Sequence, residues 1–434
     1  MKEKLFFSLL ILSFLALGFA KAQNIQFEDA NFKATLLLAS SNNKIAKDTN
    51  GNFVAIDANG DGEISQAEAL NIYYLDISKT QDITSIKGIK YFTNLTELNC
   101  ASVALESLDV SKNTNLQILI LFGCIGIKTL DISKNIDLQL LILGNTGIKT
   151  LDLSRNINLQ GLGLDSIGIQ TLDLSKNINL QWLDLSSTGI QTLDISKNIN
   201  LQGLDLSNTK IQTLDVSKNI NLQELSLDST GIQMLDISKN INLQWMNLTN
   251  TEIKTLDLSR NINLQGLGLY STVIQTLDIS KNINLQELVL SNTKIQTLDV
   301  SKNVKLQRLD LSSTGIETLD VSKNIDLKEL DLSSIGIQTL DVSHNTKLEF
   351  LRLNDCMGLT SLYMKNGVKK KFRQSKYDFS STNLNYICCG EEEIDEVKKY
   401  MQDLGRTSNL TITSDCETKP QEKTILSRKT SEKL

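Results

Sequence analysis

A hydrophobic pattern repeats every 21 residues over more than half of the chain. The unit from Leu180 to Asn200 has the skeleton L-x-x-L-x-L-x-x-T-x-I-x-x-L-D-x-S-x-N, and the next copy begins at Leu201. The starts of the thirteen units are Leu95, Leu116, Leu138, Leu159, Leu180, Leu201, Leu222, Leu243, Leu264, Leu285, Leu306, Leu327 and Leu348. Such a short unit cannot bury an apolar face alone, so the period predicts stacked coils that share one continuous core.

Each unit holds two stretches in which apolar and polar residues alternate. Alternation is the pattern of a strand, so 183–185 predicts one strand per coil and a parallel sheet along the stack. The stretch 192–196 alternates too, which predicts a second narrow sheet or an extended ribbon on the opposite face, without helices. The residues expected to point inward are Leu180, Leu183, Leu185, Ile190, Leu193 and Ile195. Asn198 and its equivalents from Asn113 to Asn345 should form an inward ladder that bonds to turn backbone.

The repeated unit resembles the leucine-rich-repeat consensus L-x-x-L-x-L-x-x-N-x-L, with Thr in place of the first Asn in most units. The resemblance implies a mainly β, right-handed leucine-rich-repeat solenoid with parallel sheet(s) and short helical caps at both ends. The stretches before Leu95 and after Leu384 also look like the caps of secreted bacterial leucine-rich-repeat proteins. We therefore expect caps at 23–94 and 363–416, repeats at 95–362, and a disordered polar tail at 417–434.

Two units depart from the regular pattern and carry Cys where Thr normally stands. Leu116 and Leu138 are 22 residues apart, and the extra residue falls near Cys124; a similar variant surrounds Cys356. We expect two buried thiols, each beside a bulge and too far apart to bond in one monomer. Near the C-terminus, Cys416 is close enough in sequence to pair with Cys388 or Cys389, and the sequence leaves that choice open.

Residues 1–22 have the features of a secretory signal peptide. Lys2 and Lys4 precede an apolar run from Leu5 to Ala20, which ends in an A-x-A site at 20–22. A transmembrane anchor is the alternative, but the run is shorter than a bilayer span. The protein is therefore expected outside the cell or at its surface. How it would be retained there stays open, because we find neither a lipoprotein cysteine nor a sorting domain.

The segment from Asp57 to Glu68 matches an EF-hand calcium loop and follows a helix expected at 27–40. Side-chain oxygens of Asp57, Asn59 and Asp61, the Glu63 carbonyl and a bidentate Glu68 would bind a structural Ca²⁺. Outside the cell such a site should bind with a Kd on the order of 10⁻⁴–10⁻³ M. The alternative is a polar turn that binds no metal.

Little in the sequence favours catalysis or nucleic-acid binding. His344 is the only histidine, so catalytic triads and histidine-rich metal sites are excluded. The formal net charge of −6 disfavours nucleic acid and anionic membranes as partners. A surface-associated enzyme is the least favoured alternative, and a non-enzymatic, monomeric binding or adhesion protein is the preferred interpretation.

The two expected faces of the solenoid differ. The first-sheet face carries variable side chains, and we predict that it binds a protein or glycan at the cell surface. The aromatic candidates for this partner-binding face are Phe122, Trp182, Trp245, Tyr270 and Phe350. They could also be incidental exposed aromatics. The opposite face repeats Thr192, Asp194, Ser196 and Lys197 almost unchanged, which predicts a soluble edge or, alternatively, a flat lattice for an ordered surface such as a polysaccharide or ice.

Overall fold

The structure, a computed structural model, describes residues 23–78, 80, 82–406 and 409–416. The predicted signal peptide and tail lie outside these residues. The fold is a mainly β, parallel-sheet solenoid with few helices, as predicted. The chain divides into two units, Met1–Leu264 and Gln265–Leu434.

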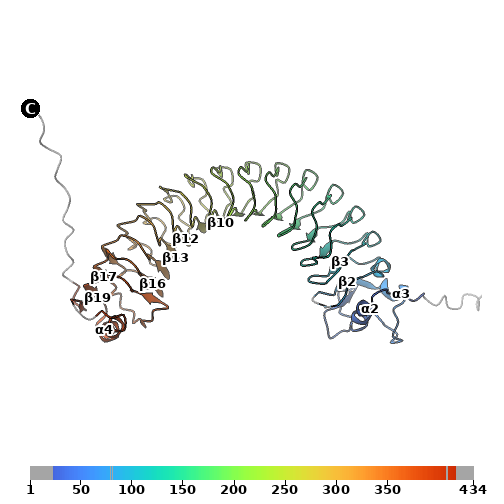
Figure 1. The fold of residues 1–434 in the computed structure, drawn as a ribbon, viewed down its shortest axis with the longest axis horizontal. Coiled ribbons are helices and arrows are strands. Elements are labelled where there is room, and N and C mark those ends of the chain that lie inside the picture. Colours follow the sequence, from blue (N-terminus) through green and yellow to red (C-terminus); the bar gives the residue numbers. More distant parts are fainter. Residues whose placement is uncertain (1–22, 79, 81, 407–408, 417–434) are drawn as a thin grey trace, which may run out of the picture. The chain divides into compact units, whose positions relative to one another are not determined.

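In the first unit, one three- to five-residue strand per coil contributes to a single sheet. The strands are β1 (Ala46–Asp48), β2 (Ile72–Asp76), β3 (Glu97–Asn99), β4 (Ile118–Ile120), β5 (Leu140–Ile142), β6 (Gly161–Gly163), β7 (Trp182–Asp184), β8 (Gly203–Asp205), β9 (Glu224–Ser226) and β10 (Trp245–Asn247). They follow one another in chain order, and all pairs are parallel except β1 with β2. The strands lie along one edge of the coils, and irregular backbone forms the opposite edge (Figure 1).

The second unit contains strands of two sheets. The strands that belong to the first sheet are β11 (Gly266–Gly268), β12 (Glu287–Val289), β13 (Arg308–Asp310), β14 (Glu329–Asp331), β16 (Phe350–Arg352) and β18 (Tyr377–Asp378). A separate four-stranded sheet consists of β15 (Thr339–Asp341), β17 (Ser361–Tyr363), β19 (Tyr386–Cys388) and β20 (Thr411–Thr413). The second sheet predicted for every coil therefore exists only at this end of the described chain. Elsewhere the second half of the coil contains no helix and is assigned no strand.

Most of the predicted inward residues form the core. Leu180, Leu183, Leu185, Ile190 and Ile195 are all at most 2% exposed. Leu193, also predicted to be inward, is a correction: it is only half-buried, as are its equivalents in the coils from Leu130 to Leu319. It lies where neighbouring backbone does not pair into a sheet, so the core does not close over it. Leu340, which lies in β15, is 1% exposed.

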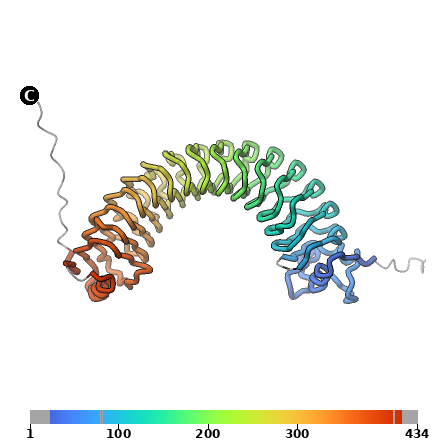
Figure 2. Tube along the Cα trace, in the orientation of Figure 1, coloured from blue at the N-terminus to red at the C-terminus, as the bar shows by residue number. Residues whose placement is uncertain are grey.

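A left-handed residue turns the chain after most first-sheet strands. In one coil this residue is Ser187, with φ of 57°, and in the next it is Asn208, with φ of 56°. A non-glycine residue there costs conformational energy. The Ser187 N–H donates to the Ser207 carbonyl at 2.7 Å, and the buried Thr188 hydroxyl donates to the Leu185 carbonyl at 2.6 Å. The turn is therefore held both within the coil and by its neighbour. Within each unit, successive coils lie side by side (Figure 2).

The asparagine ladder is present and connects successive coils. The Asn198 side-chain amide is fully buried and donates to the carbonyls of Asn177 at 2.8 Å and Leu174 at 3.2 Å. The same pair of bonds recurs at Asn219. The Asn198 Oδ1 atom, in contrast, is buried with no hydrogen-bond partner among the described residues. Asn198 therefore donates two hydrogen bonds to turn carbonyls, while its own amide oxygen accepts none in this part of the structure. Cys124 and Cys356 take the Thr position and are buried and free, as predicted.

At the N-terminal end, two short helices precede a coil that already follows the repeat. Helix α2 (Ala30–Leu37) is shorter than the predicted 27–40: the Asp29 carboxylate caps its start, and Leu38 is its C-cap. Helix α3 (Gln66–Ala69) ends the candidate calcium loop, and η1 (Ile89–Tyr91) precedes Leu95. In β2, Leu75 pairs in register with Leu98, so the stack begins before the first predicted unit.

At the C-terminal end, the repeat also continues beyond residue 362. Strand β18 pairs with β16, and the Thr382 hydroxyl donates to the Phe379 carbonyl as in regular coils. The predicted helix is η2 (Glu391–Glu393) followed by α4 (Ile394–Asp403), and Cys388, rather than Cys389, pairs with Cys416. No helix in the described part of the chain is long and apolar enough to cross a membrane.

Replacing Asn198 with Ala should destabilise the solenoid by about 1–3 kcal/mol, because two buried hydrogen bonds between coils are lost. Chemical denaturation measures the free energy of unfolding. Asn200→Ala is the matched control, since this exposed amide donates one bond, to Ile178 at 3.1 Å. Equal losses in the two variants would contradict the ladder's structural role.

Candidate ligand-binding face

The outward face of the first unit's sheet places the two tryptophans in one row. Parallel register aligns Trp182 with Gly203, Gly203 with Glu224, and Glu224 with Trp245. The indole side chains are 49% and 42% exposed. Three strand spacings separate them, or about 14 Å along the sheet. The predicted pair therefore occupies equivalent positions on one surface.

Trp182 lies flat over the adjacent strand because that strand has glycine at the matching position. A Cβ atom on Gly203 would meet the Trp182 ring at 2.2 Å. The ring therefore leans from β7 across β8, in the direction of Trp245. Gly203 was not identified from the sequence. A Trp followed 21 residues later by Gly would have indicated this arrangement, and the same pair recurs at Trp245 and Gly266.

Apolar side chains continue this face on the N-terminal side of Trp182. Ile118, Ile120, Leu140 and Ile142 lie on β4 and β5 at the outward positions and are half-buried. The Leu140 side chain in turn leans over Gly161, whose added Cβ would meet it at 2.7 Å. Trp182 thus lies at the edge of an apolar strip over β4 to β7.

Carboxylates border the same surface. Asp184 and Asp205 lie on β7 and β8, two residues beyond the Trp182 row, and each accepts a hydrogen bond from a serine N–H. Asp165 lies close to them, and burial, together with the Asp184 and Asp205 charges, raises the pKa of its carboxyl. This part of the face therefore combines an aromatic surface with a strongly negative edge.

The other three predicted aromatics do not join the Trp pair. Phe122 and Tyr270 are exposed but lie in the turns after β4 and β11, outside the strands. Phe350 occupies the Trp row on β16 in the second unit, where the Lys376 ammonium covers its ring at 4.9 Å. Of the five predicted residues, Trp182 and Trp245 alone are brought together on one sheet surface of one unit.

The predicted calcium loop folds as a tight turn around Asp57. The Asp57 carboxylate accepts from the N–H groups of Gly60, Asp61 and Gly62. Gly60 and Gly62 have φ of 72° and 79°, so the turn uses their left-handed freedom.

Glu68 reaches back from α3 to the start of this loop. Its Oε1 accepts from the N–H of Ala58 at 3.0 Å, and its Oε2 bonds to Ser65. The Glu63 side chain pairs with Lys33 at 2.6 Å. The oxygen donors are of the type that calcium prefers. Among the described residues, however, no three His, Cys, Asp or Glu side chains are grouped closely enough to hold a metal.

The uniform face on the second half of each coil is tied to its own backbone. The exposed Asp194 carboxylate accepts the Ser196 N–H at 2.9 Å, and this pattern recurs from Asp109 to Asp320. The backbone bond, then the Ser196 hydroxyl, lowers the pKa of Asp194. These carboxylates therefore brace the turns through one of their two oxygens.

Several solved structures share this fold. The functional domain of InlJ from Listeria monocytogenes, described as including a cysteine ladder, is 26% identical, with a TM-score of 0.62 over 80% of this chain and 78% of that one. A leucine-rich-repeat protein of Leptospira interrogans is 22% identical, with a TM-score of 0.65 over 80% and 91% of the two chains. An internalin of Listeria monocytogenes is 18% identical, with a TM-score of 0.54 over 91% and 99%.

These likenesses establish a fold of the leucine-rich-repeat type. No family model matches the chain. No curated protein matches it either. These neighbours are leucine-rich-repeat proteins, internalins among them.

Acid should destabilise the protein through the aspartate column. Because folding lowers the pKa of Asp173, Asp194 and Asp215, the unfolded chain binds more protons as the pH falls below the ordinary Asp value of 3.8. Their contribution is present above that value and is lost as the pH falls through the folded pKa. Melting temperature against pH measures the loss, and D173N/D194N/D215N should flatten the acid slope. An unchanged slope would contradict the assigned role.

Proposed function

We propose that this protein is a non-enzymatic, extracellular or surface binding protein whose first-sheet face around Trp182 and Trp245 binds a protein partner. The observation that carries the proposal is the aligned, exposed Trp pair on two strands of one sheet, three strand spacings apart. Tryptophan is enriched among residues that dominate binding energy at protein interfaces. A spacing of about 14 Å suits two anchor points on one extended partner better than a single small-molecule pocket.

The charges beside the Trp pair favour a partner with basic residues. Asp165, Asp184 and Asp205 form a negative edge next to Trp182, and Glu224 lies between the two Trp positions. A partner's Arg or Lys could stack on an indole face and also pair with these carboxylates. A neutral glycan could stack on the rings and donate hydroxyl hydrogen bonds to the carboxylates, but it has no positive charge to offset theirs, so a basic protein segment fits this surface better.

A structural calcium ion at the N-terminal cap remains a second proposal. Asp57, Asn59, Asp61, the Glu63 carbonyl and Glu68 would hold it, and the ion would offset the repulsion among the loop carboxylates. The loop's position between α2 and β2, where Ile25 N–H bonds to the Ile64 carbonyl at 2.8 Å, supports a role in ordering the cap. The site would stabilise the end of the solenoid and take no part in binding the partner.

The binding proposal is tested with an array of extracellular proteins and glycans, followed by measured dissociation constants for each hit. W182A/W245A should weaken protein binding by about 2 kcal/mol or more, or about thirtyfold. Affinity should also fall with rising ionic strength, since carboxylates contribute.

I199A/I262A is the matched control for this test. These two exposed isoleucines have the same sequence separation as the Trp pair, lie off the first-sheet strands, and are 52% and 51% exposed. Gly203→Ala gives a second readout, because its Cβ would displace the Trp182 ring without removing it. Equal losses in the Trp and Ile variants, or hits confined to glycans, would overturn the proposal.

Calcium binding is tested by melting and hydrogen exchange with calcium or a chelator. At a calcium concentration of about one hundred times Kd, the cap should gain about 2.7 kcal/mol, with slower exchange over residues 56–69. Glu68→Gln should lose the effect. Glu63→Gln should keep it, because only the Glu63 carbonyl would be a ligand. Coincident wild-type profiles with and without calcium would exclude the site.

A further inference from the structure

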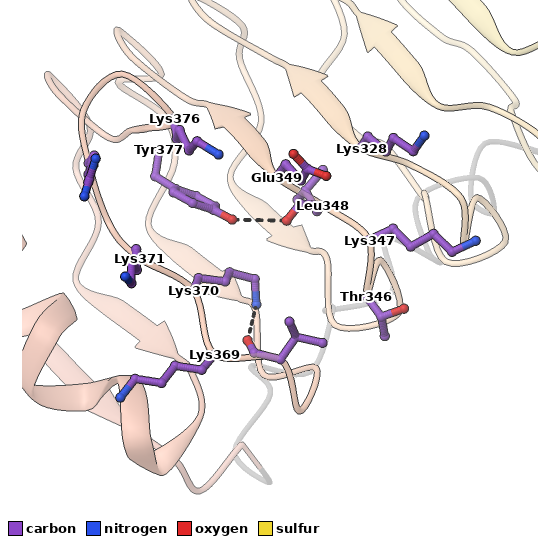
Figure 3. Close-up of a pocket in the computed structure, with 12 residues that line it drawn as sticks. Lys328, Thr346, Lys347, Leu348, Glu349, Lys369, Lys370, Lys371, Lys376 and Tyr377 are labelled. Atoms are coloured by element: carbon purple, nitrogen blue, oxygen red, sulfur yellow. Dashed lines mark hydrogen bonds between the residues drawn. The ribbon is translucent and has the colours of Figure 1, made fainter.

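A basic pocket lies in the second unit, away from the Trp pair in sequence. It measures about 690 Å³ and lies between the coil at 346–349 and the segment at 368–377 (Figure 3). Seven of its lining residues are Lys or Arg, and Glu349 is the only acidic one. A volume of this size lies in the range of ordinary ligand pockets. Such a concentration of positive charge is unexpected in a chain with net charge −6.

One extended segment supplies the central cations of this pocket. Exposure alternates along it: Lys369, Lys371 and Arg373 are exposed, whereas Lys370 and Phe372 are buried. Alternation places the three exposed cations on the same side of an extended chain. None of the three forms an ion pair with a carboxylate in the described part of the chain, so their charges are available to a ligand.

The buried residues of the segment hold it in place. The Lys370 ammonium donates to Asn366 at 2.7 Å and to Val368 at 3.2 Å, and it lies 3.8 Å from Glu393. The Lys370 backbone N–H donates to the Glu393 carboxylate, and Phe372 packs against Tyr377 with ring centroids 5.0 Å apart.

A hydrogen bond to helix α4 also holds the segment in place. The Phe372 N–H donates to the Glu396 carboxylate at 3.0 Å. The exposed cations are therefore presented by a braced segment, which lowers the entropic cost of binding.

Two further lysines on the facing coils line the pocket. Lys347 pairs with Asp326 at 2.5 Å, and Lys328 donates to the Gln307 amide oxygen at 3.0 Å. Lys376 lies over the Phe350 ring. Even with the Lys347 and Lys370 charges offset by their carboxylates, five cations face the single charge of Glu349. Cations that line one pocket repel each other, so a multivalent anion would relieve the repulsion.

The geometry points to a site for a compact polyanion that carries several phosphate or sulfate groups. Arg and Lys side chains donate charge-assisted hydrogen bonds to the oxygens of such groups. Lys369, Lys371 and Arg373 supply the fixed part of the site, and Lys328 and Lys376 also line it. This site goes beyond the proposed protein-binding face and does not depend on it.

Calorimetric titration of the full chain tests the site with two probes, inorganic tripolyphosphate and a sulfated disaccharide. At about 0.15 M ionic strength, where exposed charges are screened beyond about 8 Å, saturable binding of at least one probe is expected. The probe that binds distinguishes a phosphate from a sulfate ligand. K369Q/K371Q/R373Q should raise its Kd at least about tenfold, because the braced cations are removed.

K197Q/K218Q/K239Q is the matched control, since it removes the same number of charges from exposed positions on the uniform face. Its Kd should equal that of the wild type. Equal weakening in both triple variants would show nonspecific attraction and overturn the site. Failure of both probes to bind the wild type at about 1 mM would overturn it as well. Unchanged melting temperatures show that the variants are folded.

Discussion

Each coil in this protein depends on its neighbours to satisfy buried backbone groups. Bonds within one coil, such as that from the Asn177 N–H to the Leu174 carbonyl, are supplemented by bonds between coils. The Asn198 amide bonds to Asn177 and Leu174 of the preceding coil, and the Ser187 N–H bonds to Ser207 of the next. An insertion is tolerated where it leaves these donors in place, as beside Cys124, where the Asn135 amide still bonds to Val110 and Asn113. Hydrogen bonds between coils therefore set the register of the stack, while the side chains at outward positions are free to vary.

That freedom connects the repeat to binding. Because the strands from β5 to β10 pair in register, each outward residue on β5 to β9 has a set neighbour 21 positions along the chain. Large residues beside glycines, as Trp182 is beside Gly203, can lie across the sheet and expose a ring face. The solenoid then acts as a rigid support on which aromatic and acidic groups occupy defined spacings. Rigid support of this kind lowers the entropic cost of binding.

Much of this arrangement could be predicted from the sequence, because a 21-residue repeat averages out local ambiguity. The strand positions, the Asn198 ladder and the buried Cys124 and Cys356 followed from periodicity. The half-burial of Leu193 could not be predicted from periodicity, because it depends on whether neighbouring coils pair into a second sheet. Coils at Ile72 and Tyr377 were missed because their residues match the pattern only once they are aligned in space. The basic pocket could not be predicted either, because the net charge of the whole chain does not reveal a local cluster of Lys and Arg side chains.

The fluorescence of the two tryptophans tests the central claim most directly. Trp182 and Trp245 are the only tryptophans in the chain, and both lie on the proposed face. Titration with an Arg/Lys-rich extended peptide, or with a protein partner from the array, should change their emission saturably and reduce quenching by acrylamide. The change should weaken as ionic strength rises. Binding detected by calorimetry while the emission and quenching of both tryptophans stay unchanged would contradict the account.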